Sequence, residues 1–136
     1  MAPAATPTTF ETVVGNALLC LDRIDPAYFK TYLTTYFKPP VRTEGDAYWF
    51  RPESIGLYGM EVNEIFVSTE SSPIDFLGVI LNEKLAQARQ KIFAATGIRY
   101  LPGKNPAVLR SPAGGFLMQY ATLKTKLVCV IYRNHP

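Results

Sequence analysis

The residues that most often perform chemistry in proteins are few in this sequence and lie far apart. The 136-residue chain has two cysteines, Cys20 and Cys129, and one histidine, His135, which is the penultimate residue. Nucleophilic Ser-His-Asp and Cys-His arrangements require a histidine held in place, and a zinc site requires several cysteine or histidine ligands. The sequence contains no Walker loop, dinucleotide-binding glycine fingerprint or EF-hand loop. We therefore expect no metal ion and no cofactor.

Paired carboxylates are the remaining candidates for catalysis. Glu61 and Glu64, or Glu70 and Asp75, are the nearest such pairs in the sequence, and a glycosidase uses two carboxyl groups that flank the scissile bond. Solvated surface acids explain the same pattern more simply. A small carboxylate-dependent hydrolase is therefore the weakest of the functions considered, and the sequence favours a protein that is not an enzyme.

The two cysteines are predicted to face inward, Cys20 on a helix and Cys129 on a strand. In an exported protein an even pair of this kind favours a disulfide. The alternative is two buried free thiols, because cysteine packs well as a small apolar residue. A disulfide that closes a loop on the order of 100 residues would stabilise the fold by up to about 4.7 kcal/mol.

The N-terminal residues resemble the start of a mature exported protein. The first seven residues, MAPAATP, are small and uncharged, and the first charged residue is Glu11. This pattern is expected after removal of a signal peptide, and a flexible cytosolic tail is the alternative. We expect residues 1–8 to be flexible and residues 9–136 to form a single domain in the periplasm or outside the cell.

The composition predicts a folded domain with a substantial core. The chain is 48% hydrophobic and 18% charged, and its longest apolar runs, 76–81 and 127–132, are six residues long. A membrane-spanning helix needs about 20 apolar residues. No transmembrane segment is therefore expected.

Charge is distributed unevenly along the sequence. Residues 84–136 contain nine basic and no acidic side chains, whereas the first 83 residues contain five basic and eleven acidic ones. One interpretation is that opposite charges pair across neighbouring strands. The other is a basic surface patch that attracts an anionic envelope polymer or another protein.

Four basic residues near predicted turns are the candidates for such a patch: Lys104, Arg110, Lys124 and Lys126. Aromatic residues lie between them in the sequence, as in some sites that bind nucleic acid. Their spacing is typical of core residues, however, and export argues against a nucleic-acid partner. The oligomeric state is not predicted.

Helical periodicity and capping residues predict three helices. Thr8 and Glu11 form a capping box before a helix over 9–23, and Asp25-Pro26 begins a second helix over 26–37. A third helix covers about 83–96, with Asn82 as its N-cap and Gly97 after its C-terminus.

Apolar and β-branched runs predict eight strands, over residues 47–50, 55–58, 61–68, 76–81, 98–101, 107–110, 116–121 and 127–132. The order α-α-β-β-β-β-α-β-β-β-β with short turns indicates an α+β fold on a mainly antiparallel sheet. The final strand is apolar on both faces, which predicts a central strand covered on both sides. Trp49, the only tryptophan, is expected to be a core or half-buried strand residue, with a binding platform as the alternative.

The stretches TFETVVGNALLCLDRIDPAYFKTYL, AYWF and VCVIYR together resemble small uncharacterised exported proteins of Gram-negative bacteria. The resemblance covers nearly the whole chain. It implies a periplasmic or secreted location, recognition as a surface or secreted antigen, and no known activity. It assigns no functional residue.

The first hypothesis for function is a non-enzymatic binding domain of the bacterial cell envelope, whose ligand is a protein or an anionic envelope polymer. The second is an inhibitor or immunity factor that acts on a cell-wall hydrolase and inserts the loop 102–106 or 111–115 into a cleft. That second hypothesis is an analogy from the fold class alone.

Overall fold

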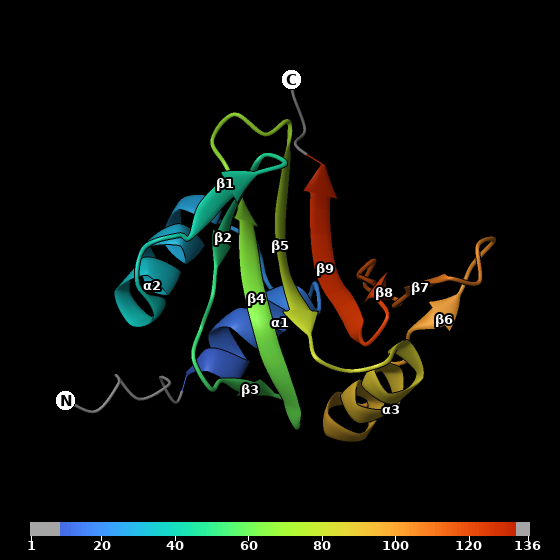
Figure 1. Ribbon diagram of the computed structural model, residues 1–136. Helices are drawn as coiled ribbons and strands as arrows, with labels where there is room; N and C mark the ends of the chain where they lie inside the picture. Colours follow the sequence, from blue (N-terminus) through green and yellow to red (C-terminus); the bar gives the residue numbers. More distant parts are fainter. Residues whose placement is uncertain (1–8, 133–136) are drawn as a thin grey trace.

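A nine-stranded antiparallel sheet forms the body of the protein, and the helices pack against one of its faces (Figure 1). The computed structural model describes residues 9–132, so the expectation for residues 1–8 falls outside it. The strands lie in the order β1-β2-β4-β5-β9-β8-β7-β6, and β3 pairs with β4 alone. The predicted α+β class with a mainly antiparallel sheet is confirmed.

The strands are β1 (Arg42–Glu44), β2 (Ala47–Phe50), β3 (Gly56–Leu57), β4 (Met60–Ser68), β5 (Ile74–Leu81), β6 (Leu101–Pro102), β7 (Val108–Arg110), β8 (Phe116–Ala121) and β9 (Lys124–Tyr132). All eight predicted strands are present, with bounds shifted by up to three residues. The strand β1 is additional, because none of the predicted strands covers residues 42–44. Gly45 and Asp46 both have positive φ angles, of 62° and 59°, as a two-residue type I′ hairpin turn requires.

The second and third helices agree closely with the sequence. Helix α2 spans Pro26–Phe37 and has Asp25 as its N-cap, whose carboxylate accepts from the Tyr28 amide at 3.3 Å. Helix α3 spans Leu85–Thr96 and ends at Gly97 in the left-handed conformation. Its N-cap is Lys84 with no side-chain capping bond, so the prediction that Asn82 caps it is wrong.

The first helix is shorter than predicted. A π-helical segment, η1 (Glu11–Gly15), continues into α1 (Asn16–Leu18), and Cys20 then has a φ angle of 61°. A positive φ interrupts a right-handed helix, so the expectation of a helix to residue 23 is wrong. Glu11 accepts from the Tyr58 amide at 3.1 Å, and Tyr58 lies in the turn before β4.

Cys20 and Cys129 form a disulfide, and their Cα atoms are 5.4 Å apart. Cys129 lies on β9 and is fully buried, whereas Cys20 lies in the turn after α1. The predicted pairing is confirmed, and the alternative of two free thiols does not apply. The bond fixes the N-terminal helical segment against the centre of the sheet.

The final strand is central, as predicted, because β9 pairs with both β5 and β8. Among residues 9–132, helices pack on only one of its faces. Leu127 and Cys129 face the helices and are fully buried, whereas Lys126 and Val130 on the other face are half-buried. The apolar residues of that second face form a smaller cluster that includes no helical residue.

Candidate functional site

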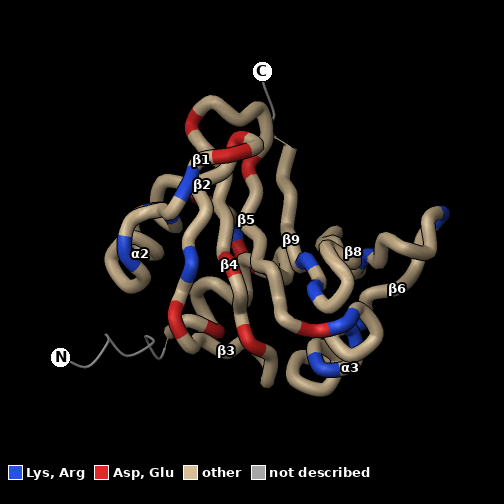
Figure 2. The backbone as a smooth tube through the Cα atoms, viewed as in Figure 1, with Lys and Arg blue, Asp and Glu red and all other residues tan. Residues whose placement is uncertain are grey.

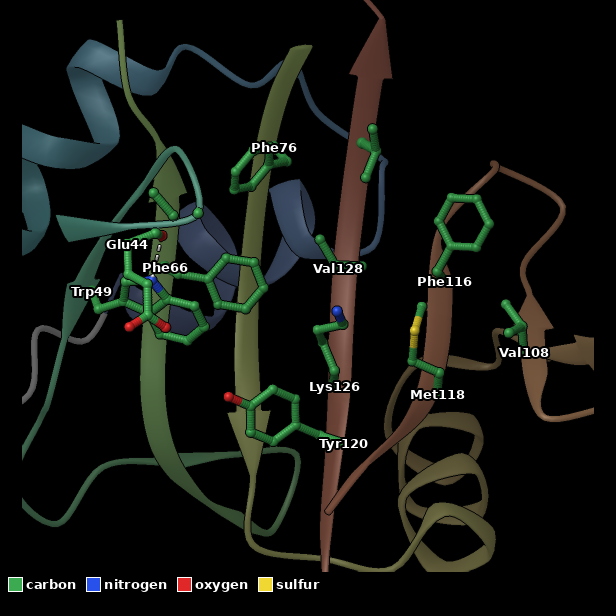
Figure 3. A pocket seen from close by; sticks show the side chains of 13 residues that line it. Glu44, Trp49, Phe66, Phe76, Val108, Phe116, Met118, Tyr120, Lys126 and Val128 are labelled. Carbon is green, nitrogen blue, oxygen red and sulfur yellow. Dashed lines mark hydrogen bonds between the residues drawn. The ribbon is translucent and has the colours of Figure 1, made fainter. Parts of the chain in front are cut away.

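The sheet face that none of the described helices covers, here called the open face, contains an apolar hollow of about 470 Å³ (Figure 3). Its lining comes from seven strands and the β1–β2 turn: Glu44, Gly45, Ala47, Trp49, Phe66, Phe76, Val108, Phe116, Met118, Tyr120, Lys126, Val128 and Val130. Small-molecule sites usually have volumes of about 300–1,000 Å³ and mostly apolar linings with few polar groups. The hollow has both properties.

Aromatic rings form one wall of the hollow. The rings of Trp49 and Phe66 are 4.7 Å apart, and those of Phe66 and Phe76 are 6.0 Å apart. The Phe66 ring lies directly over Gly78 on β5, where a Cβ atom would overlap it. Glycine at this position therefore allows Phe66 to lie across the neighbouring strand.

The strand register explains why these residues share a face. A row of directly paired residues crosses the sheet in the order Arg42, Trp49, Phe66, Gly78, Val128, Phe116 and Arg110. At its ends, the Arg42 guanidinium is 4.4 Å from the Trp49 ring and the Arg110 guanidinium is 4.9 Å from the Phe116 ring. Arginines therefore stack on aromatic residues at both sides of the hollow.

A partly buried ion pair supports the wall that contains Trp49. Arg42 donates two hydrogen bonds to Glu64, at 2.6 and 3.3 Å, and Arg51 is 3.6 Å from the same carboxylate. The Glu64 side chain is only 9% exposed. The hydrogen bonds to Glu64 raise the pKa of Arg42 above its ordinary value. Both guanidinium groups contact the Glu64 carboxylate, which therefore serves as a structural partner beneath this wall.

Lys126 is the cation of the hollow. Its side chain lies between Val128 and Tyr120 in the lining (Figure 3). Among the described carboxylates, none lies within 4.0 Å of its ammonium group. Glu44 lines the opposite side of the hollow, on β1. Lys126 and Glu44 therefore place opposite charges on two sides of the hollow.

Three of the four residues proposed as a basic patch share the open face. Lys126 lines the hollow, and Lys124 precedes it by two residues on the same strand, so both point to the same side. Arg110 stacks on Phe116. Lys104 lies apart from them, in the exposed loop between β6 and β7. None of the four forms an ion pair with a described carboxylate.

The acidic and basic parts of the sequence therefore remain largely separate in the fold (Figure 2). One ion pair joins them among the described residues: Lys91 is 2.7 Å from Glu83. The other described pairs lie within the first 83 residues. Pairing of opposite charges across strands does not neutralise the candidate basic residues.

The candidate carboxylate pairs have structural partners. Glu61 accepts a hydrogen bond from Asn82 at 2.5 Å. Glu70 and Asp75 both line a second, polar hollow of about 290 Å³ beside α2. There the hydrogen bond from Tyr48 to Glu70, with a length of 2.6 Å, lowers the pKa of the Glu70 carboxyl. A general acid at neutral pH needs a raised pKa, so this arrangement does not favour glycoside hydrolysis by Glu70 as the acid.

Comparison with known protein families, curated proteins and solved structures finds no match. Two further findings concern residues 9–132 alone. No helix in this range is long and apolar enough to cross a bilayer. No group of three or more His, Cys, Asp and Glu side chains in this range is placed to hold a metal ion. The interpretation of the site therefore depends on its own geometry.

Trp49 is the site residue that the sequence came nearest to identifying. It is half-buried in β2, as expected, and it also lines the hollow, while its role as a binding platform stays a prediction. Phe66, Phe76 and Phe116 were predicted only as strand residues. Period-two alternation places them on one face, but it does not reveal that the helices cover the other.

Proposed function

We propose that the protein is a non-enzymatic binding domain of the bacterial cell envelope and that its ligand occupies the hollow of the open face. The observation that supports this is the apolar lining of the hollow, of which Trp49, Phe76 and Phe116 are only partly buried. Exposed apolar clusters on a folded domain mark sites of interaction. The disulfide is compatible with an exported protein.

The experiment uses Trp49 as an intrinsic probe, because it is the only tryptophan and lines the hollow. The oxidised protein is titrated with 1-decanol. Trp49 emission is expected to change as 1-decanol is added and to level off once the hollow is occupied. Met118→Glu introduces a charge into the lining and should abolish the response. Leu123→Glu is the matched control, because Leu123 is 59% exposed in the β8–β9 turn and does not line the hollow.

Thermal unfolding of both variants checks that they are folded. An emission spectrum that does not respond to 1-decanol would contradict the proposal. An equal response from wild type and from a folded Met118→Glu variant would contradict it as well.

A second candidate function is inhibition of a cell-wall hydrolase. It is favoured by the loop between β6 and β7, in which residues 103–107 are all exposed. The other loop considered, 111–115, is compact: the Ser111 hydroxyl accepts from the Gly115 amide at 2.9 Å, and both residues are buried. The test is inhibition of lysozyme by the intact protein. Inhibition that is lost when residues 103–107 are replaced by a Gly-Ser sequence would favour this candidate over the first.

A further inference from the structure

We infer that the ligand of the hollow is a single acyl chain that ends in a carboxylate, with its tail on the aromatic wall and its head group at Lys126. The inference builds on the proposed function, because it assigns a chemical class to the occupant of the same hollow. It depends on three features: the apolar lining, one cation within that lining, and the charges around it.

The apolar lining provides the tail site. Phe66 and Val128 are 5% and 6% exposed at the base, and Trp49, Phe76 and Phe116 are half-buried around them. Burial of apolar surface contributes roughly 25 cal/mol per Å², so an alkyl chain gains affinity along this wall. A volume of about 470 Å³ is within the range for a small ligand and is small for a folded partner domain.

Lys126 provides the head-group site. Lys126 is a half-buried residue beside Val128 and Tyr120, and its ammonium forms no ion pair with a described carboxylate. A cation beside an apolar surface is less well hydrated than one in open solvent, and it interacts more strongly with an anion there. A charge-assisted hydrogen bond to a carboxylate is the interaction that this group lacks.

The surrounding charges favour an anion at this side. Lys124 shares the face, and its ammonium contacts the Asn63 side-chain oxygen at 3.3 Å, a neutral partner. Glu64 is already paired with Arg42 and Arg51. Glu44 lies on the opposite side of the hollow, where it would repel a carboxylate. These charges orient the head group toward Lys126.

Two other occupants are less compatible with this face. A second copy of the chain would bring Lys124, Lys126 and Arg110 toward the same residues of its partner or toward its apolar wall, and like charges repel. A bilayer surface would need apolar side chains that project outward, whereas Phe66 and Val128 are almost fully buried at the base of a hollow. Both remain outcomes of the experiment.

The experiment compares three probes with the same ten-carbon chain: decanoate, 1-decanol and decylammonium. Trp49 emission of the intact, oxidised protein reports binding near neutral pH. We expect decanoate to bind best. Lys126→Gln should weaken decanoate binding by about tenfold or more, the effect of losing one charge-assisted interaction, and should leave 1-decanol binding unchanged. Lys104→Gln is the control for net charge, because Lys104 lies in a distant exposed loop.

The outcomes separate the two proposals. Equal binding of decanoate and 1-decanol with no effect of Lys126→Gln would overturn the head-group assignment and leave the hollow as an apolar site. Preference for decylammonium would overturn it as well. Failure of all three probes would overturn the proposed function too.

A concentration-dependent dimer that shields Trp49 would replace the inferred ligand with a second copy of the chain. Binding to anionic phospholipid vesicles without binding of free decanoate would replace it with a membrane. Thermal unfolding verifies that both variants are folded.

Discussion

At the scale of single residues, the hydroxyl of Tyr100 is the buried polar group without a hydrogen bond among the described side chains. Tyr100 is fully buried, and the neighbouring Ser111 hydroxyl accepts from the Gly115 amide but makes no hydrogen bond of acceptable geometry to Tyr100. A buried, unpaired hydroxyl costs free energy. We predict that Tyr100→Phe, which keeps the ring, raises the free energy of unfolding by about 1 kcal/mol, measured by urea denaturation.

The same chemical change at Tyr48 is the control for that prediction. The Tyr48 hydroxyl donates to Glu70 at 2.6 Å on the surface, so Tyr48→Phe should leave stability unchanged or lower it slightly. A loss of stability in Tyr100→Phe would show that its hydroxyl has a partner after all.

The half-buried Tyr58 and the buried Tyr100 also make stability dependent on alkaline pH. Burial, with a smaller effect of the Glu11 carboxylate, raises the pKa of Tyr58 to about 12, and burial raises that of Tyr100 well above its ordinary value. In the unfolded chain both hydroxyls ionise near pH 10. Their contribution to stability is therefore complete below about pH 10 and is lost as the pH rises toward 12.

Urea unfolding at about pH 8 and about pH 11 tests this dependence. The free energy of unfolding should be lower at the higher pH, and the decrease should be smaller in Tyr100→Phe than in wild type. Equal stability at the two pH values would contradict the prediction.

At the scale of elements, Arg42 holds the three-residue edge strand β1 to the sheet. It donates two hydrogen bonds to Glu64 and stacks on Trp49. Arg42→Lys keeps the charge and loses the planar fork. We predict a loss of about 1.5 kcal/mol in stability and faster amide exchange at Val41, whose N–H donates to the Trp49 carbonyl at 2.8 Å.

Lys38→Ala is the control for β1. Lys38 pairs with Glu53 at 3.6 Å, and both side chains are more than 70% exposed. Exposed pairs of this kind contribute about 0–1 kcal/mol. Stability and exchange at Val41 should therefore be nearly unchanged in this variant, and an equal effect in both variants would refute the assigned role of Arg42.

Elements with local signals were predicted well, and those that depend on distant contacts were not. Helix α2 has Asp25-Pro26 at its start and Pro39-Pro40 after its end, and its predicted bounds are correct. The first helix stops early, and it does so beside the disulfide, at Cys20. The strand β1 was missed because its residues are polar, although Gly45-Asp46 is a local signal for the hairpin that contains it.

The candidate site was predictable only in part for a similar reason. Val128 and Val130 are two residues apart on the final strand, so alternation places them on one face, and both belong to the apolar cluster of the open face. Which face the helices cover depends on packing across the whole sheet, and apolar residues occur on both faces. The sequence therefore predicted coverage on both sides and missed the hollow.

At the scale of the whole molecule, the disulfide joins residues 109 positions apart and connects the first helical segment with the last strand. A closed loop of this length restricts the unfolded chain strongly. We predict that replacing both Cys20 and Cys129 with alanine lowers the free energy of unfolding by about 2–5 kcal/mol, measured by urea denaturation against the oxidised wild type.

Thiol counting completes that test and connects it to the cellular compartment. Mass spectrometry of the unreduced protein after alkylation should find no free thiol, since Cys20 and Cys129 are the only cysteines. Two alkylated cysteines in native protein would mean that the bond does not form in solution. The proposal of an oxidising, extracytoplasmic location would then lose its chemical basis, whereas the hollow and its proposed ligand would stay testable through Trp49.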